Sequence, residues 1–200
     1  RGTTISDVTA NCGMAYIAVP TPPLQDGSCD IRIVESILNE LPDGFVAVIK
    51  STVVPGTTEV LQQKFPNLKL AYSPEFLVER QRLENFANQK ILVVGTKHQE
   101  VAELVFKHHI EAGVLIGNNI FHVSPTEAEM VKYTKNNFYA LKVIFANQMH
   151  DLCTAMGIEW SVIREIITTP QHQIIGDSHL EPLMGLNRGF GGKCLPKDTL

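Results

Sequence analysis

Short apolar runs alternate with amphipathic segments along the first 124 residues of the chain. Each apolar run is bounded by glycine, proline or small polar residues, which predicts buried β-strands at 13–19, 46–50, 68–72, 91–94 and 120–123. Helices are predicted between them, including one that Asp30 should cap and one that Thr96 and Gln99 should cap as a capping box. The alternation favours an α/β fold, a partial doubly wound parallel sheet with helices on both faces.

A single long helix is predicted after the last strand. Ser124 and Glu127 form a capping box around Pro125, and no helix breaker follows until Gly157. The helix should therefore hold about 30 residues and measure about 45 Å. We expect it to join two domains or to pack against a second subunit, because its apolar side chains cover more than one face; they include Phe138, Tyr139, Leu141, Ile144, Phe145 and Met149. A shorter helix is predicted over 161–168.

Composition narrows the class of protein. Of the 200 residues, 44% are hydrophobic and 19% are charged, as in ordinary soluble globular proteins. The formal net charge of -4 gives no reason to expect nucleic acid or a membrane surface as a partner. No apolar run approaches the roughly 20 residues that span a bilayer. The cysteines are scattered without a C-x-x-C pair, which predicts free thiols and a cytoplasmic protein; they are Cys12, Cys29, Cys153 and Cys194.

Polar residues follow the predicted strands. Ligands bind at the carboxyl ends of the strands in such sheets, so the candidate binding loops are those that begin at Val19, Ser51, Ser73 and Ser124. Thr21 and Thr52 could bind a cofactor or a water molecule. Glu75 and Glu79 could divide acid–base work between substrate and cofactor, or could be surface acids at the start of a helix.

Two further groups are candidates for chemistry. Lys132 and Asn136 lie one turn apart on the long helix, where they could stabilise an oxyanion or form a solvated polar stripe. Cys194 follows a glycine-rich run and lies near two lysines, a setting that favours a thiolate nucleophile; a free cysteine can also be a small buried hydrophobe. The histidines lack metal-ligand spacing, so no metal is expected.

Five stretches resemble the UDP-glucose/GDP-mannose dehydrogenase family in their order and approximate spacing: 19–22, 50–55, 73–79, 129–136 and 189–199. The resemblance covers nearly the whole chain, and the cysteine loop is its most specific part. It implies that residues 1–124 are the C-terminal part of an NAD-binding, Rossmann-like domain. It also implies that residues 125–200 are a central helical dimerisation domain with the catalytic cysteine loop, and that the protein is a homodimer through helix 125–156.

The activity that the resemblance implies is the NAD-dependent oxidation of the C6 alcohol of a nucleotide sugar to a carboxylate. UDP-glucose, giving UDP-glucuronate, is the favoured substrate; the loop 191–198 looks more like that of the UDP-glucose and GDP-mannose members than that of the members acting on N-acetylated sugars. Cys194 would form a thiohemiacetal and then a thioester during two hydride transfers. The other implied catalytic residues are Lys132 and Asn136 for the oxyanion, Asp198 and Thr52 for a water molecule that acts as the base, and Glu75 for thioester hydrolysis.

The same resemblance implies two sets of binding residues. Those expected to meet NAD are Val19, Thr21, Pro22, Ser51, Thr52, Glu79 and Lys197. Those expected to meet the substrate are Glu75, Phe76, Leu77, Lys132, Asn136, Phe190 and Gly191.

The sequence departs from the family at both ends. The G-x-G-x-x-G turn and the acidic residue that binds the adenosine ribose are missing, and the chain stops just after the cysteine loop. The first residue is not Met. We therefore expect an internal fragment that folds but is inactive, because the binding site for the pyrophosphate is missing.

Two alternatives stay open at this point. A β-hydroxyacid or 6-phosphogluconate-type dehydrogenase also has a Lys-x-x-x-Asn pair on a helix after a Rossmann domain, but it needs no cysteine nucleophile. The second alternative is a non-catalytic fragment that only dimerises through the long helix. Loss of iodoacetamide sensitivity on Cys194→Ser would exclude the first, and a labelled sugar trapped on Cys194 would exclude the second.

Overall fold

The computed structural model describes residues 4–26, 28–77, 82–170, 176, 179–180, 195 and 199. The chain divides into two compact units, Arg1–Lys132 and Tyr133–Leu200, and one long helix contributes residues to both. None of the helices in the described ranges combines the length and the apolar character that crossing a membrane requires.

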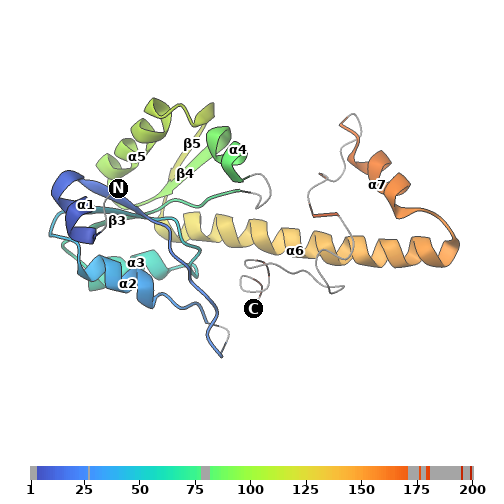
Figure 1. Cartoon of the computed structure of the whole chain (residues 1–200), viewed down its shortest axis with the longest axis horizontal. Helices are drawn as coiled ribbons and strands as arrows, with labels where there is room; N and C mark the ends of the chain where they lie inside the picture. Colours follow the sequence, from blue (N-terminus) through green and yellow to red (C-terminus); the bar gives the residue numbers. More distant parts are fainter. Residues whose placement is uncertain are drawn as a thin grey trace. The chain divides into compact units, whose positions relative to one another are not determined.

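The first unit is built on a five-stranded sheet in the order β1-β2-β3-β4-β5 (Figure 1). Its strands are β1 (Met14–Ile17), β2 (Val46–Ile49), β3 (Lys69–Tyr72), β4 (Gln89–Gly95) and β5 (Leu115–Val123). All five were predicted, and the α/β class is confirmed. The predicted parallel arrangement holds for three of the four neighbouring strand pairs, and β4 runs antiparallel to β3 in the fourth. Hydrophobic alternation identifies a strand but does not encode its direction.

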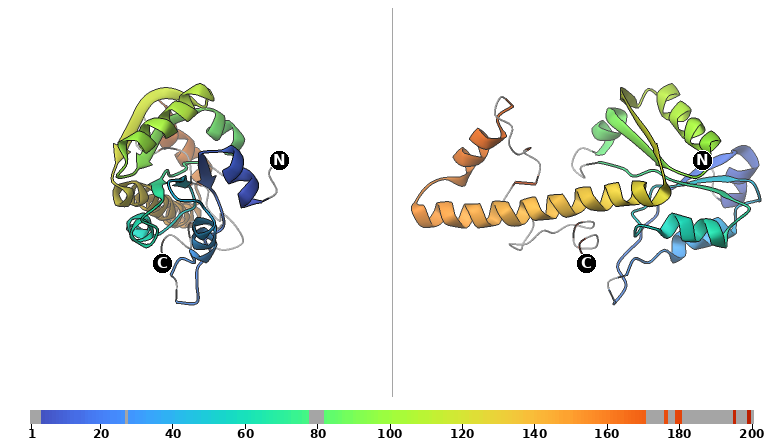
Figure 2. Two further views of the ribbon diagram at one scale, coloured as in Figure 1. Left: turned by 90° about the vertical axis from the view of Figure 1, so that its left-hand side faces the viewer. Right: turned by 180° about the vertical axis from the view of Figure 1, so that it is seen from behind.

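Helices cover both faces of the sheet (Figure 1 and Figure 2). Helices α2 (Arg32–Asn39) and α3 (Thr57–Lys64) pack on one face, where Leu38 and Leu61 join the core formed by the strands. Helix α5 (Gln99–Glu111) packs on the opposite face through Val101, Ala102 and Val105. Two short helices, α1 (Ile5–Asn11) and α4 (Arg82–Ala87), were not predicted.

The predicted long helix is α6 (Pro125–Met156), which has 32 residues, and α7 (Trp160–Thr168) follows it. The capping box of α6 is confirmed: the backbone N–H of Ser124 donates to Glu127 at 2.8 Å, and that of Glu127 donates to the Ser124 hydroxyl at 3.3 Å. Because α6 runs through both units, its first two turns belong to the sheet domain and the remainder to the second unit.

Two other predicted caps were wrong. The N-cap of α2 is Ile31, although the Asp30 carboxylate still accepts the backbone N–H of Arg32 at 3.0 Å. The N-cap of α5 is His98; the Thr96 hydroxyl accepts the backbone N–H of His98 at 3.2 Å and donates to the carbonyl of Leu70 at 2.8 Å. In both cases the side chain that was predicted to cap the helix forms other hydrogen bonds.

Candidate active site

Three parallel strands end at the same edge of the sheet. The register aligns Ile17, Ile49 and Tyr72, the last residues of β1, β2 and β3. The residues that follow these strands therefore lie side by side, as ligand-binding loops do in α/β sheets. This edge brings together the loops that contain Thr21, Thr52 and Glu75.

Hydrogen bonds fix the first two of these loops to each other. The Ser51 hydroxyl donates to the carbonyl of Val19 at 2.7 Å and accepts the backbone N–H of Val19 at 2.9 Å. The Thr21 hydroxyl donates to the backbone carbonyl of Thr52 at 2.7 Å, so the Thr52 hydroxyl is not used in this contact. Ser51 and Thr21 are both buried at this edge. Pro22 is exposed, and its carbonyl accepts the backbone N–H of Asp30 at 2.9 Å.

The third loop holds an ion pair with helix α6. The Lys132 ammonium lies 2.7 Å from Oε1 of Glu75 and 2.9 Å from the backbone carbonyl of the same residue. The second carboxylate oxygen, Oε2, accepts the backbone N–H of Leu77 at 2.6 Å. The Lys132 side chain is 6% exposed and that of Glu75 is 30% exposed, so the pair is partly shielded from water. A shielded pair of this kind can present both a proton donor and a carboxylate to one ligand.

A second lysine reaches the same edge. Lys50 follows β2, and its ammonium donates to the buried hydroxyl of Ser73 at 3.3 Å and lies 6.0 Å from the ring centre of Tyr16. Burial lowers the pKa of Lys50 to about 8, the positive charge of Lys132 acts in the same direction, and the carboxylate of Glu75 opposes them. Lys50 was not among the predicted site residues. A lysine directly after a buried parallel strand was the signal that could have identified it.

The remaining predicted residues are only partly placed. Asn136 is 5% exposed and lies one turn after Lys132 on α6. Phe76 and Leu77 are half-buried in the loop after β3. Six predicted site residues lie outside the described residues, namely Glu79, Phe190, Gly191, Cys194, Lys197 and Asp198. Across the described ranges, no three His, Cys, Asp or Glu side chains come together as a metal site.

A mostly parallel sheet with polar loops gathered at the carboxyl ends of its strands defines a Rossmann-like, dinucleotide-binding class of protein. The particular family follows from comparison. The NAD binding domain of the UDP-glucose/GDP-mannose dehydrogenase family matches residues 1–110, and the central domain of that family matches residues 126–200. The chain belongs to the UDP-glucose/GDP-mannose dehydrogenase family, and the predicted cofactor, NAD, is confirmed by the domain that it matches.

Individual relatives agree with this assignment. The chain is 30% identical to the UDP-glucose 6-dehydrogenase AglM of Haloferax volcanii, in an alignment that covers 100% of the chain and 49% of that protein. It is 25% identical to the GDP-mannose 6-dehydrogenase of Pseudomonas aeruginosa, covering 93% and 45% respectively. The structure of a UDP-glucose dehydrogenase from Pyrobaculum islandicum superposes with a TM-score of 0.81 at 31% identity, over 99% of this chain and 47% of the other. The chain thus spans about half the length of these relatives.

The described residues agree with a cofactor at this edge of the sheet, because the loops after β1, β2 and β3 begin there and the third loop holds the Lys132–Glu75 pair. Binding of the pyrophosphate in this class depends on a G-x-G-x-x-G turn before a helix, which the sequence does not contain.

Proposed function

We propose that the protein to which this chain belongs is an NAD-dependent nucleotide-sugar 6-dehydrogenase that oxidises UDP-glucose to UDP-glucuronate. The observation that most supports this function is the shielded pair of Lys132 and Glu75 at the carboxyl edge of a dinucleotide-binding sheet. UDP-glucose is favoured as substrate because AglM and the Pyrobaculum enzyme are named for it, and the loop 191–198 looks like that of UDP-glucose and GDP-mannose members.

The first oxidation converts the C6 alcohol to an aldehyde. NAD supplies the hydride acceptor in both oxidations. In our proposal the water molecule held by Thr52 and Asp198 takes the hydroxyl proton, and Lys132 and Asn136 stabilise the negative charge that develops on the C6 oxygen. An ammonium has three N–H donors and Glu75 accepts from it at two atoms, so Lys132 can still donate to a substrate oxygen.

The second oxidation is proposed to pass through Cys194. Its thiolate adds to the C6 aldehyde to form a thiohemiacetal, with the new oxyanion stabilised by Lys132 and Asn136. A second hydride transfer from C6, with loss of the hydroxyl proton, would convert the thiohemiacetal on Cys194 to a thioester. Water then adds to the thioester carbon, the C–S bond breaks, and the carboxylate and the thiol are released. Glu75 is the proposed base for this hydrolysis, because its carboxylate is the acid group nearest to Lys132.

We further propose that residues 1–124 form the C-terminal part of the NAD-binding domain and that residues 125–200 form the dimerisation domain with the cysteine loop. The proposed cofactor contacts are Val19, Thr21, Pro22, Ser51, Thr52, Glu79 and Lys197. The proposed substrate contacts are Glu75, Phe76, Leu77, Lys132, Asn136, Phe190 and Gly191. We predict that residues 1–200 alone are inactive, because their sequence has no glycine-rich turn to bind the pyrophosphate of NAD.

The proposed partner of helix α6 is a second copy of the chain. In the second unit this helix exposes Phe138, Leu141, Phe145 and Leu152, whose spacing of three, four and seven residues is typical of a helix–helix seam. Three of these side chains line a hollow of about 370 Å³, namely Phe138, Leu141 and Phe145, together with Lys142, Ile144, Gln148 and Gly176. Apolar side chains gathered on one long helix are typical of a protein–protein interface.

The activity is tested with the full-length protein and a panel of nucleotide sugars. We expect reduction of two NAD molecules for each UDP-glucose consumed, and we expect mass spectrometry of acid-quenched enzyme to detect a sugar thioester on Cys194. Reduction of only one NAD per sugar, or full activity in Cys194→Ala, would contradict the covalent mechanism. A clear preference for another nucleotide sugar would contradict the proposed substrate and leave the reaction type unchanged.

A further inference from the structure

Glu129 is the most deeply buried acidic residue in the described part of the chain, and the sequence analysis gave it no role. Its side chain lies on the same face of α6 as Lys132, one turn earlier, and Glu129 is 0% exposed. A carboxylate is costly to bury unless hydrogen-bond donors surround it. The donors that surround Glu129 come from the other side of the interface between α6 and the sheet domain.

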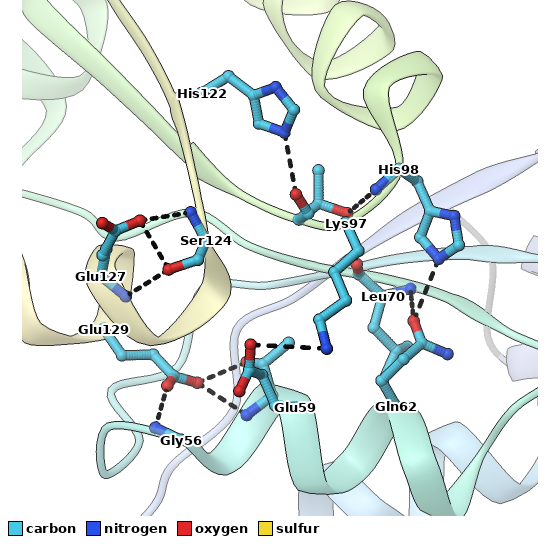
Figure 3. A network of polar contacts seen from close by, with 12 residues as sticks. Gly56, Glu59, Gln62, Leu70, Lys97, His98, His122, Ser124, Glu127 and Glu129 are labelled. Atoms are coloured by element: carbon cyan, nitrogen blue, oxygen red, sulfur yellow. Dashed lines mark hydrogen bonds and ion pairs between the residues drawn. The ribbon is translucent and has the colours of Figure 1, made fainter.

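All three donors belong to the start of helix α3 (Figure 3). The Glu129 carboxylate accepts the backbone N–H of Gly56 at 2.5 Å, the backbone N–H of Thr58 at 2.8 Å and the Thr58 hydroxyl at 2.6 Å. The N-cap of α3 is Gly56, which has no side chain and adopts the left-handed φ of 96°. Glu129 therefore supplies, from 71 residues away, the cap that the local sequence lacks.

Burial and hydrogen bonding act in opposite directions on the charge of the Glu129 carboxylate. Burial raises the pKa of Glu129, and the hydrogen bonds from Thr58 and Gly56 oppose this shift because they favour the charged form. The nearby negative charge of Glu59 raises the pKa of Glu129 further, and Lys97 lies 3.7 Å from Glu59. The positive end of the α3 helix dipole also favours a negative charge at this position.

The cap connects two parts of the candidate active site. Glu129 binds Gly56 at the end of the loop that begins at Thr52. At the start of this loop, the backbone carbonyl of Thr52 accepts a hydrogen bond from the hydroxyl of Thr21. On α6, the side chain of Glu129 is hydrogen-bonded to α3, and the side chain of Lys132, one turn later, is hydrogen-bonded to Glu75. Two anchors on one face fix the rotation of α6 about its axis, and this rotation determines where the Lys132 ammonium points.

We propose that Glu129 is a positioning residue for the reaction, which holds Lys132 and the Thr52 loop in their catalytic arrangement by capping helix α3. Glu129 does not touch the reacting atoms. The proposal rests on the proposed function, because it assigns Lys132 and Thr52 to the chemistry. A displacement of about 1 Å in a catalytic group can lower a rate about 100-fold, so a loosened anchor should affect turnover before it affects substrate binding.

The test compares Glu129→Gln with Glu127→Gln in the full-length protein. Glutamine keeps the shape of Glu129 but places an NH₂ group against backbone N–H donors, so at least one donor loses its acceptor. Glu127 lies on the same turn of α6, is exposed and only caps its own helix, so its variant controls for a general loss of helix stability. Thr58→Val removes one of the three donors from the opposite side and serves as a second, milder variant.

We expect Glu129→Gln to lower kcat by up to about 100-fold with little change in the KM for the nucleotide sugar. Thr58→Val should lower kcat less, and Glu127→Gln should leave it at the wild-type value. Hydrogen exchange should become faster at the backbone N–H groups of Gly56 and Thr58 in Glu129→Gln but not in Glu127→Gln, a change that needs no bound cofactor to be observed.

Three outcomes would overturn the proposal. The first is a Glu129→Gln enzyme that turns over like Glu127→Gln, and the second is unchanged exchange at Gly56 and Thr58. If Glu129→Gln does not fold, the third is a folded Thr58→Val enzyme with wild-type kcat. A wild-type protein that reduces no NAD with any nucleotide sugar would instead overturn the proposed function itself, so the two failures are distinguishable.

Discussion

The ammonium of Lys132 donates to Glu75 twice, at 2.7 Å to the carboxylate and at 2.9 Å to the backbone carbonyl. The lysine therefore fixes both the side chain and the main chain of the loop after β3. This contact joins residues 57 positions apart and places a cation and a carboxylate at the edge where three parallel strands end.

Replacing Lys132 with methionine should lower kcat by about 100- to 1,000-fold, the usual effect of removing one donor that stabilises an oxyanion. Methionine keeps the length and most of the packing of the lysine stem but has no N–H donor. Steady-state NAD reduction by the full-length protein measures the effect. Lys107→Met, on the exposed surface of α5, is the control and should keep the wild-type kcat. Equal rates in the two variants would exclude Lys132 from the chemistry.

Replacing Glu75 with glutamine should slow the hydrolysis of the thioester rather than the hydride transfers. Glutamine keeps an oxygen that can accept from Lys132 or Leu77, but it cannot act as a base. We expect a rapid burst of NADH in stopped-flow absorbance, followed by a steady state about 100- to 10,000-fold slower than that of the wild type. The thioester on Cys194 should accumulate in acid-quenched samples.

The exposed residue Glu111 provides the control for that experiment, and Glu111→Gln should show neither the burst nor the slow steady state. A Glu75→Gln enzyme in which the first turnover is also slow would contradict the assignment, because Glu75 would then act before the thioester forms.

The sequence predicted which loops lie at the carboxyl edge of the sheet, but it did not predict the contacts made by the residues at this edge. Strands can be recognised from runs of buried residues, and parallel neighbours must end at one edge, so the positions of Thr21, Thr52 and Glu75 followed from the pattern. Helical spacing placed Lys132 and Asn136 on one face of α6. It did not show that this face meets Glu75, because periodicity along one element contains no information about which loop lies opposite.

The cap supplied by Glu129 illustrates the same limit. Sequence reasoning looks for a capping residue within a few positions of a helix start, as it did correctly for Ser124 and Glu127. At α3 the chain has Gly56, and the cap comes from another helix. A helix start without a local cap was the only signal, and it indicates that a partner exists without identifying it.

Lys50 should make the stability of the protein depend on pH above neutrality. Burial lowers its pKa from 10.5 to about 8. Between these values the unfolded chain binds a proton that the folded chain has released, so the free energy of unfolding should rise with pH across this window. Below pH 8 both states are protonated, and the buried charge destabilises the fold by about 3 kcal/mol. Lys50→Met should remove this contribution.

The measurement is urea unfolding of the wild type and Lys50→Met at several pH values from 7 to 11. The variant should gain most in stability at the lowest pH, and its advantage should shrink toward pH 10.5. The other groups that face Lys50 are Ser73, Tyr16, His109, Glu75 and Lys132, and they are the same in both proteins. A constant difference across this range would mean that Lys50 does not titrate as described.

The proposed dimer predicts that a charge on the exposed face of α6 separates the subunits. Leu141 is 59% exposed at the centre of this face, so Leu141→Glu should place a carboxylate in the seam between two copies of the helix. Analytical ultracentrifugation of the full-length protein should show a dimer for the wild type and a monomer for the variant. Leu83→Glu, at an exposed leucine of α4, should remain dimeric. A wild-type monomer would contradict the proposal.

Gly95, at the end of β4, should tolerate no side chain, because the first turn of α6 packs directly on it. A Cβ atom there would lie 2.6 Å from the Cβ of Ala128, 2.8 Å from the Cα of Pro125 and 2.8 Å from the carbonyl oxygen of Ser124. Two of these atoms belong to the backbone and cannot move without shifting the helix. We expect Gly95→Ala to lower the free energy of unfolding by about 1–3 kcal/mol.

The control is Gly13→Ala, because a Cβ atom at that exposed glycine meets nothing within 4 Å. A double variant gives the sharper test. Ala128→Gly removes only the closest of the three contacts, so combined with Gly95→Ala it should restore part of the lost stability and not all of it. Full recovery would show that the side chain of Ala128 alone limits the approach. Measured against Ala128→Gly alone, which allows for the cost of glycine in a helix, partial recovery would show that the backbone at Ser124 and Pro125 also limits the approach of α6 to the end of the sheet.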